Sequence, residues 1–177
     1  MAALFRARFL FMGQFFSSLL DRPEYVHVLI NHLPLLGLPV AMLTLMIGLV
    51  AGNRPIILTG LGLVALLALS IWPVYSFGES SYDRVLSMSD EAGEGFLKYH
   101  AALAHQWSFL YFVTAAVAGL GFGLAWKWPR VLKPIALAAL VLGLVSLGAG
   151  MVIAHAGGEI RHREFRTGPP PAVSEAR

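Results

Sequence analysis

Four long stretches of this chain carry no charged side chain, and they limit the possible folds more than any other feature. The charge-free stretches are residues 25–53, 55–78, 99–126 and 134–158. A helix needs about 20 apolar residues to cross the hydrocarbon core of a bilayer, and each stretch is long enough. Because backbone groups in lipid must satisfy one another, each stretch is predicted to be a transmembrane helix.

The composition supports the same interpretation. Of the 177 residues, 57% are hydrophobic and only 13% are charged, whereas soluble domains carry about 25% charged residues. The chain therefore cannot form the polar coat of a soluble globule, and disorder or a nucleic-acid-binding arm is excluded. The absence of cysteine also excludes disulfides, thiolate metal sites and a cysteine nucleophile.

The expected fold is an all-α integral membrane four-helix bundle formed by residues 23–166. Two of its connections, at 51–55 and 127–134, are short, which predicts an up-down-up-down arrangement. The third connection, residues 79–98, contains five acidic residues and is expected to be a polar loop that is helical only in part.

Two segments are expected to lie outside the bundle. Residues 1–22 have apolar residues at helical spacing beside Arg6 and Arg8 and are predicted to be an interfacial amphipathic helix, with a signal peptide as the alternative. Residues 167–177 contain three consecutive prolines and are predicted to be a disordered tail.

The charges lie unequally on the two sides of the expected membrane. Both termini and residues 79–98 share one side, here called side X, and the opposite side Y has Arg54, Lys127, Arg130 and Lys133 but no acid. The positive-inside rule taken literally puts side X in the cytoplasm, whereas the unbalanced positive charge of side Y argues for the reverse. The sequence thus predicts a bacterial inner membrane protein with both termini on one side and leaves its orientation open.

All six histidines lie at or near side X. His27 and His32 begin the first span, His100 and His105 begin the third, and His155 and His162 follow at the end of the fourth. His32 and His105 lie roughly 7 Å deeper than the others, from the helical rise. A spacing of five residues rotates a side chain by about 140°, so the two members of each pair cannot share one small site in a straight helix.

The histidines point to a nitrogen-ligated cofactor. Ionisable groups inside a span usually face the interior of the bundle, so His32 and His105 are the first candidate ligands. His27, His100 and His155 are further candidates, with an interfacial polar role as the alternative for each. Neutral imidazole suits haem iron or copper, and a b-type haem needs only axial ligands and an apolar slot. Its propionates would pair with the cations of side X: Arg161, Arg163, Arg84 and Lys98.

Other metal sites are consistent with the same residues. A copper or zinc centre would need about three nitrogens, which the layer of His100, His155 and His162 could supply. Covalent c-type haem is excluded because the chain has no C-x-x-C-H motif. The pair Gly157 and Gly158 either lets backbone approach a cofactor edge or caps a helix C-terminus.

Several motifs together resemble those of a family. His27-x4-His32-x-Pro34 resembles the opening H-x4-H-x-P signature of a group of uncharacterised bacterial four-helix membrane proteins. His100 and Gly157-Gly158-x3-His162 are similar to its later elements, and the resemblance covers residues 25–165. The chain departs from the family in having Glu-Ile-Arg before His162, where two apolar residues and a Tyr are usual. The resemblance implies a four-helix membrane fold and supports the choice of these histidines as candidate site residues. It implies no assigned activity.

The predicted function is that of a small membrane cytochrome-like electron-transfer protein or subunit. It would exchange electrons with quinol in the bilayer or with a redox partner protein at the surface. The alternatives are a non-catalytic subunit of a larger membrane complex or homo-oligomer, and a protein that binds copper or zinc. No hydrolase triad, phosphate-binding loop or H-E-x-x-H motif is present, no nucleic-acid partner is expected, and enzymatic activity is left open.

Overall fold

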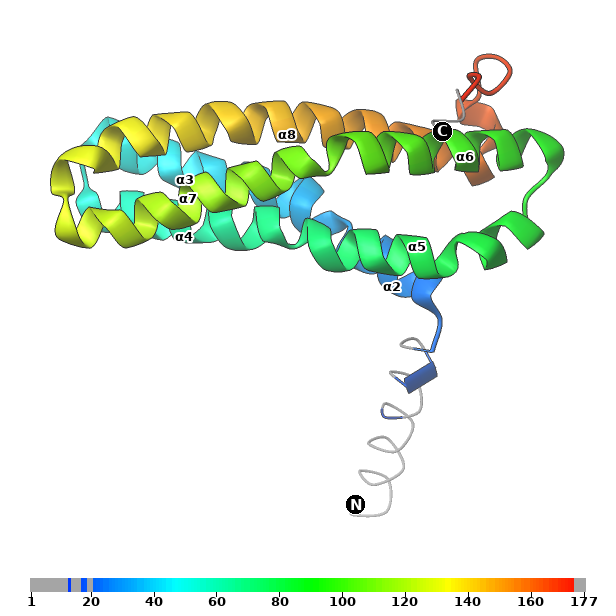
Figure 1. Cartoon of the computed structure of the whole chain (residues 1–177), viewed down its shortest axis with the longest axis horizontal. Coiled ribbons are helices and arrows are strands. Elements are labelled where there is room, and N and C mark those ends of the chain that lie inside the picture. Colours follow the sequence, from blue (N-terminus) through cyan, green and yellow to red (C-terminus); the bar gives the residue numbers. More distant parts are fainter. Residues whose placement is uncertain (1–12, 14–16, 19–20, 174–177) are drawn as a thin grey trace, which may run out of the picture.

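A computed structural model describes residues 13, 17–18 and 21–173, and every regular element of this part is a helix (Figure 1). Four helical stretches are long and apolar enough to cross a membrane: Pro23–Ala51, Arg54–Ser87, Glu91–Lys127 and Pro129–Arg161. The prediction of an all-helical fold with four helices of membrane length is therefore confirmed. Most of the expected interfacial helix at residues 1–22 lies outside the described residues.

Each long stretch is built from shorter helices. Their bounds are α2 Pro23–Ile30, a π-helical turn Leu33–Gly37, α3 Leu38–Ala51, α4 Arg54–Leu69, α5 Ile71–Ser87, α6 Glu91–Trp107, α7 Phe109–Lys127, a 3₁₀ turn Pro129–Val131, α8 Leu132–Arg161 and a 3₁₀ turn Arg163–Phe165. The break between α2 and α3 contains Pro34, whose missing N–H removes a helical hydrogen bond.

The polar connection between α5 and α6 is much shorter than expected. Only residues 88–90 separate the two helices, so most of residues 79–98 is helical and not a loop. The carboxylate of Asp90 accepts a hydrogen bond from the backbone N–H of Gly93 at 2.8 Å and so caps the start of α6. This cap lets a polar sequence continue the helix beyond the apolar span.

The helices pack tightly in the half of the molecule that is distant from residues 88–90, here called the Y half. It comprises α3, α4, α7 and the first half of α8, and it holds the main hydrophobic core, with Leu45, Leu61 and Tyr111 fully buried. A Cβ placed on Gly60 would lie 2.6 Å from the Cα of Leu45. The backbones of α3 and α4 are therefore in direct contact.

The other half, here called the X half, has a different organisation. It comprises α2, α5, α6 and the second half of α8, in which α2 packs chiefly on α5 and α6 on α8 (Figure 1). A small hydrophobic cluster around Phe96, Leu97 and Ile160 lies near its end, and α2 contributes to neither hydrophobic cluster. The X half is thus two helix pairs joined by a limited apolar contact.

Candidate functional site

Two histidines from different helix pairs meet in the X half. His27 lies on α2 and His100 on α6, with ring centroids 6.3 Å apart and ring planes at 88°. Both side chains are partly buried. They are the histidines that the structure brings together from the set that the sequence singled out.

Each of the two rings is held by the partner helix of its own pair. The Nδ1 of His27 lies 2.8 Å from the carbonyl oxygen of Val74 in α5, and the Nδ1 of His100 lies 2.9 Å from that of Ile153 in α8. A carbonyl oxygen only accepts hydrogen bonds, so each Nδ1 donates. In the neutral ring, the lone pair is then on Nε2 and available to a ligand.

A glycine lies beneath each imidazole. Gly78 and Gly157 each follow the accepting carbonyl by four residues, which places them one helical turn further along the same face. A Cβ on Gly78 would lie 3.0 Å from the Nδ1 of His27, and one on Gly157 would lie 3.1 Å from the Cε1 of His100. Each ring therefore packs directly against the helix backbone at a glycine, where a larger residue would crowd it.

The two halves of the chain repeat this arrangement. The repeated elements are His27-x4-His32 with Val74-x3-Gly78, and His100-x4-His105 with Ile153-x3-Gly157. The contacts between the N-terminal and C-terminal halves of the chain follow the same pattern. The first span of one half packs on the second span of the other: α3 packs on α8, and α7 packs on α4. The arrangement is an approximate two-fold symmetry that places His27 and His100 opposite each other. The repeated H-x4-H spacing is the sequence signal that could have revealed it.

The two histidines that the sequence favoured as inner ligands lie elsewhere. His32 and His105 are both exposed. The Nδ1 of His32 is 2.9 Å from the carbonyl oxygen of Val28 in its own helix. The five-residue spacing rotates each of them away from the interior-facing His27 or His100, and the structure does not bring them together.

The three-nitrogen centre considered as the alternative to haem is not formed among the described residues. Within the described part of the chain, no group of three or more His, Asp or Glu side chains could hold a metal ion. His155 is exposed, with its Nε2 3.9 Å from Glu159. His162 lies beyond the end of α8, where its ring stacks on Phe165 at 4.9 Å. The layer of His100, His155 and His162 is not formed because α8 ends at Arg161 and His162 has an extended backbone conformation, so the seven-residue spacing no longer puts His155 and His162 on one helix face.

Two of the arginines expected to bind propionates, Arg161 and Arg163, contact protein groups in this structure. Arg161 donates to the carbonyl oxygen of Met88 at 3.0 Å, and the Nη2 of Arg163 lies 2.9 Å from Asp90. Both arginines are exposed. These contacts link the connection between α5 and α6 to the end of α8. The connection lies close to the two arginines because α5 and α6 extend as helices through most of residues 79–98.

Sequence reasoning missed Arg166, which makes the most extensive contacts at this end of the molecule. Its guanidinium donates to both carboxylate oxygens of Asp90, at 3.0 and 3.1 Å, and to the carbonyl oxygens of Glu159 and Ile160. The hydrogen bonds that Asp90 accepts from Arg166 and from the backbone N–H of Gly93 lower the pKa of Asp90 to about 2. Pairing with the C-terminal carbonyls of α8 is favourable for a cation.

A carboxylate lies one helical turn before His27. The Oε1 of Glu24 is 3.0 Å from the Nε of Arg84 in α5. Among the described residues, the Oε2 of Glu24 is a buried oxygen with no hydrogen-bond partner. The pair adds a further link between α2 and α5 near the candidate site.

In comparisons with protein-family models, with curated proteins and with solved structures, no match to this chain was found.

Proposed function

We propose that this chain is an integral membrane cytochrome-like protein that holds a b-type haem between His27 and His100 and transfers electrons. Its four long helices would cross the membrane up-down-up-down, as in the family that the sequence resembles, with a bacterial inner membrane as the expected location. The observation that carries the proposal is the pair of neighbouring imidazoles, with centroids 6.3 Å apart, each of which donates a hydrogen bond from Nδ1 to a carbonyl oxygen of its neighbouring helix.

The separation of the two rings supports a metal between them. Two metal–nitrogen bonds of about 2 Å, together with the distance from each nitrogen to its ring centre, add up to roughly 6 Å between centroids. The observed distance is 6.3 Å. Perpendicular rings are compatible with this geometry because each imidazole can take its own rotation about its metal–nitrogen bond. An edge-to-face contact of two rings has centroids at a similar distance, so the spectrum must distinguish the two cases.

The chemistry of the donor set favours haem iron. Two neutral imidazoles suit iron and fit calcium or magnesium poorly. The hydrogen bonds to Val74 and Ile153 fix the orientation of both rings and increase the basicity of Nε2. The macrocycle would lie between the α2–α5 pair and the α6–α8 pair. When bound, haem supplies one-electron chemistry, and these residues hold and orient it.

The visible spectrum and iron content of the purified protein test the proposal. We expect a Soret band with sharp reduced α and β bands, and loss of haem in His27→Ala and in His100→Ala. His155→Ala is the matched control, because His155 is exposed on α8, and it should keep the wild-type spectrum. Iron-free, colourless protein from haem-replete cells would overturn the proposal and favour a non-catalytic structural subunit.

A further inference from the structure

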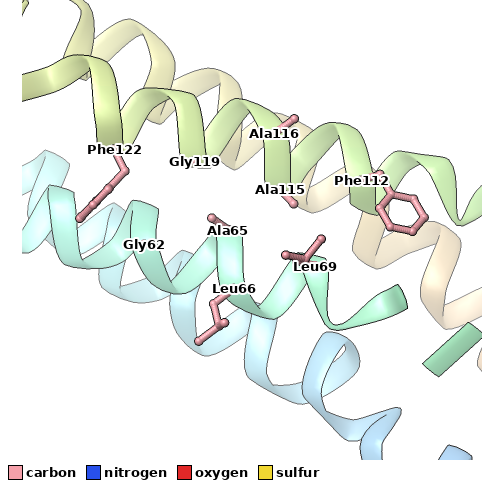
Figure 2. Close-up of a pocket in the computed structure, with 9 residues that line it drawn as sticks. All are labelled: Gly62, Ala65, Leu66, Leu69, Phe112, Ala115, Ala116, Gly119 and Phe122. Atoms are coloured by element: carbon pink, nitrogen blue, oxygen red, sulfur yellow. The ribbon is translucent and has the colours of Figure 1, made fainter. Parts of the chain in front are cut away.

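An apolar groove lies on the outer surface of the bundle between α4 and α7 (Figure 2). It has a volume of about 550 Å³ and is lined by Gly62, Ala65, Leu66, Leu69, Phe112, Ala115, Ala116, Gly119 and Phe122. Figure 2 shows Leu69 and Phe112 at one end of the groove and Phe122 at the other, with small residues between them. Such a volume is typical of a small-molecule site.

An imidazole is aligned with the end of this groove nearest the X half. His105, Phe112 and Gly119 are spaced by seven residues along α6 and α7, so they lie on the same face. His105 is exposed, and its ring has no hydrogen-bond partner in the part of the chain that the structure describes. In a membrane-spanning helix, such a group is a functional-site candidate. It also lies only five residues, a rise of roughly 7 Å, from His100.

We propose that the groove and His105 together form a quinol site, which rests on the proposed haem function. The prenyl chain would lie in the groove between Phe112 and Phe122, and a quinol hydroxyl would donate a hydrogen bond to the imidazole of His105. A quinol fits better than a phospholipid because its compact head is uncharged and can enter the membrane to the depth of His105, whereas a charged phosphate stays at the interface.

A haem held by His27 and His100 would be the oxidant of the bound quinol. Oxidation of one quinol to the quinone releases two electrons and two protons. A haem held by His27 and His100 would supply one-electron chemistry, so it would take the two electrons one at a time, and a one-electron redox partner protein at the surface would reoxidise it after each transfer. The protons leave the quinol hydroxyls through His105 toward side X.

Binding of decylubiquinone to the protein in lipid nanodiscs, followed by quenching of tryptophan fluorescence, tests this site. Gly119→Leu fills the groove, and its backbone can carry a side chain because a Cβ there meets only Ala65, at 3.9 Å. We expect about tenfold weaker binding in this variant. Gly148→Leu is the matched control, because a Cβ on Gly148 in α8 meets nothing within 4 Å, and its binding should be unchanged.

A second pair of variants tests the head-group contact. Decylubiquinone has no hydroxyl, so its carbonyl oxygen would accept a hydrogen bond from the ring N–H of His105, and His105→Leu should weaken its binding about tenfold through the loss of that bond. His32→Leu is the matched control, because His32 has the equivalent H-x4-H position in the other half of the chain and is exposed. Non-saturable quenching, or equal effects of the groove variants and their controls, would overturn the site.

The outcomes for quinol and for haem are separable. Dithionite reduction reports the haem alone, and it should be the same in the wild type and in all four variants. If dithionite reduces the haem but decylubiquinone does not bind, the quinol site fails and the proposed haem function stands. If the protein has no Soret band but quinone binding is saturable and sensitive to Gly119→Leu, the quinone site stands and the haem function fails.

Discussion

The X and Y halves use the same kind of residue, glycine, for opposite purposes. In the Y half, Gly60 lets the backbone of α4 contact the backbone of α3 at Leu45. In the X half, Gly78 and Gly157 let helix backbone contact the imidazoles of His27 and His100. Small residues therefore close the bundle at one end and make room for polar side chains at the other.

The Y half contributes most of the stability of the fold, whereas the X half contains the candidate ligand site. The main buried core lies in the Y half, whereas the X half has two helix pairs and a small cluster near its end. Changes in the Y half should therefore act on the free energy of unfolding. Changes in the X half should act on ligand binding, with less effect on folding.

The largest expected effect is on stability, from Gly60→Val. A Cβ there would lie 2.6 Å from the Cα of Leu45, so α3 and α4 must separate, at a cost of about 3 kcal/mol. Thermal unfolding of the protein in detergent measures this loss of stability. Gly123→Val is the control, because a Cβ on Gly123 meets nothing within 4 Å. Equal stability of the two variants would mean that close helix contact does not hold the Y half together.

The equivalent change in the X half should have a different result. Gly157→Val pushes against the ring of His100, which a Cβ would approach to 3.1 Å. A side chain yields more easily than backbone, so we expect a loss of about 1 kcal/mol in stability together with loss of the Soret band. Spectra and melting curves of Gly157→Val and Gly148→Val compare the two. A large loss of stability with an unchanged spectrum would contradict the division between the halves.

A smaller effect is expected from the buried hydroxyl pair of Thr114 in α7 and Ser146 in α8. Their oxygens are 2.8 Å apart and both residues are fully buried. Thr114→Val leaves the Ser146 hydroxyl unpaired and should cost about 1 kcal/mol. Adding Ser146→Ala should recover part of the loss. A double-mutant cycle measures the coupling, and additive losses would show that the hydrogen bond contributes nothing.

The smallest effect is a local one, at Asp90. Its pKa of about 2 is below the ordinary 3.8, so its pairing with Arg166 stabilises the fold fully above roughly pH 4. This contribution is lost as the pH falls through 2. At neutral pH, Asp90→Asn should speed hydrogen exchange in residues 162–173 and leave the haem spectrum unchanged. Glu91→Gln, at an exposed neighbour, should change neither.

The membrane-length helices could be predicted from the sequence because charge is excluded from lipid. Their full length could not, because the extension of α5 and α6 depends on caps such as Asp90 and on contacts with Arg166, which is distant in sequence. A charge-free stretch indicates which residues could cross a membrane, but it does not indicate where the helix ends.

The candidate site was predicted in residue type and position along the helices but not in pairing. Counting residues gives the depth of a histidine, and depth favoured His32 and His105. Which side of a helix faces the interior depends on neighbouring helices, and only the structure shows His27 beside Val74 and His100 beside Ile153. The contacts of Gly78 with His27 and of Gly157 with His100 could not be predicted from the sequence, because they depend on how the helices pack.

Electron paramagnetic resonance of the oxidised protein tests the central claim most directly. Axial imidazoles with perpendicular planes leave two iron d orbitals nearly equal in energy, which produces a highly anisotropic low-spin ferric signal, whereas parallel planes produce a rhombic one. The planes of His27 and His100 are at 88°, so we predict the anisotropic signal, abolished in His27→Ala and in His100→Ala and retained in His32→Ala. Iron-free protein, or a low-spin signal that persists in both of the first two variants, would contradict a haem held between these two histidines.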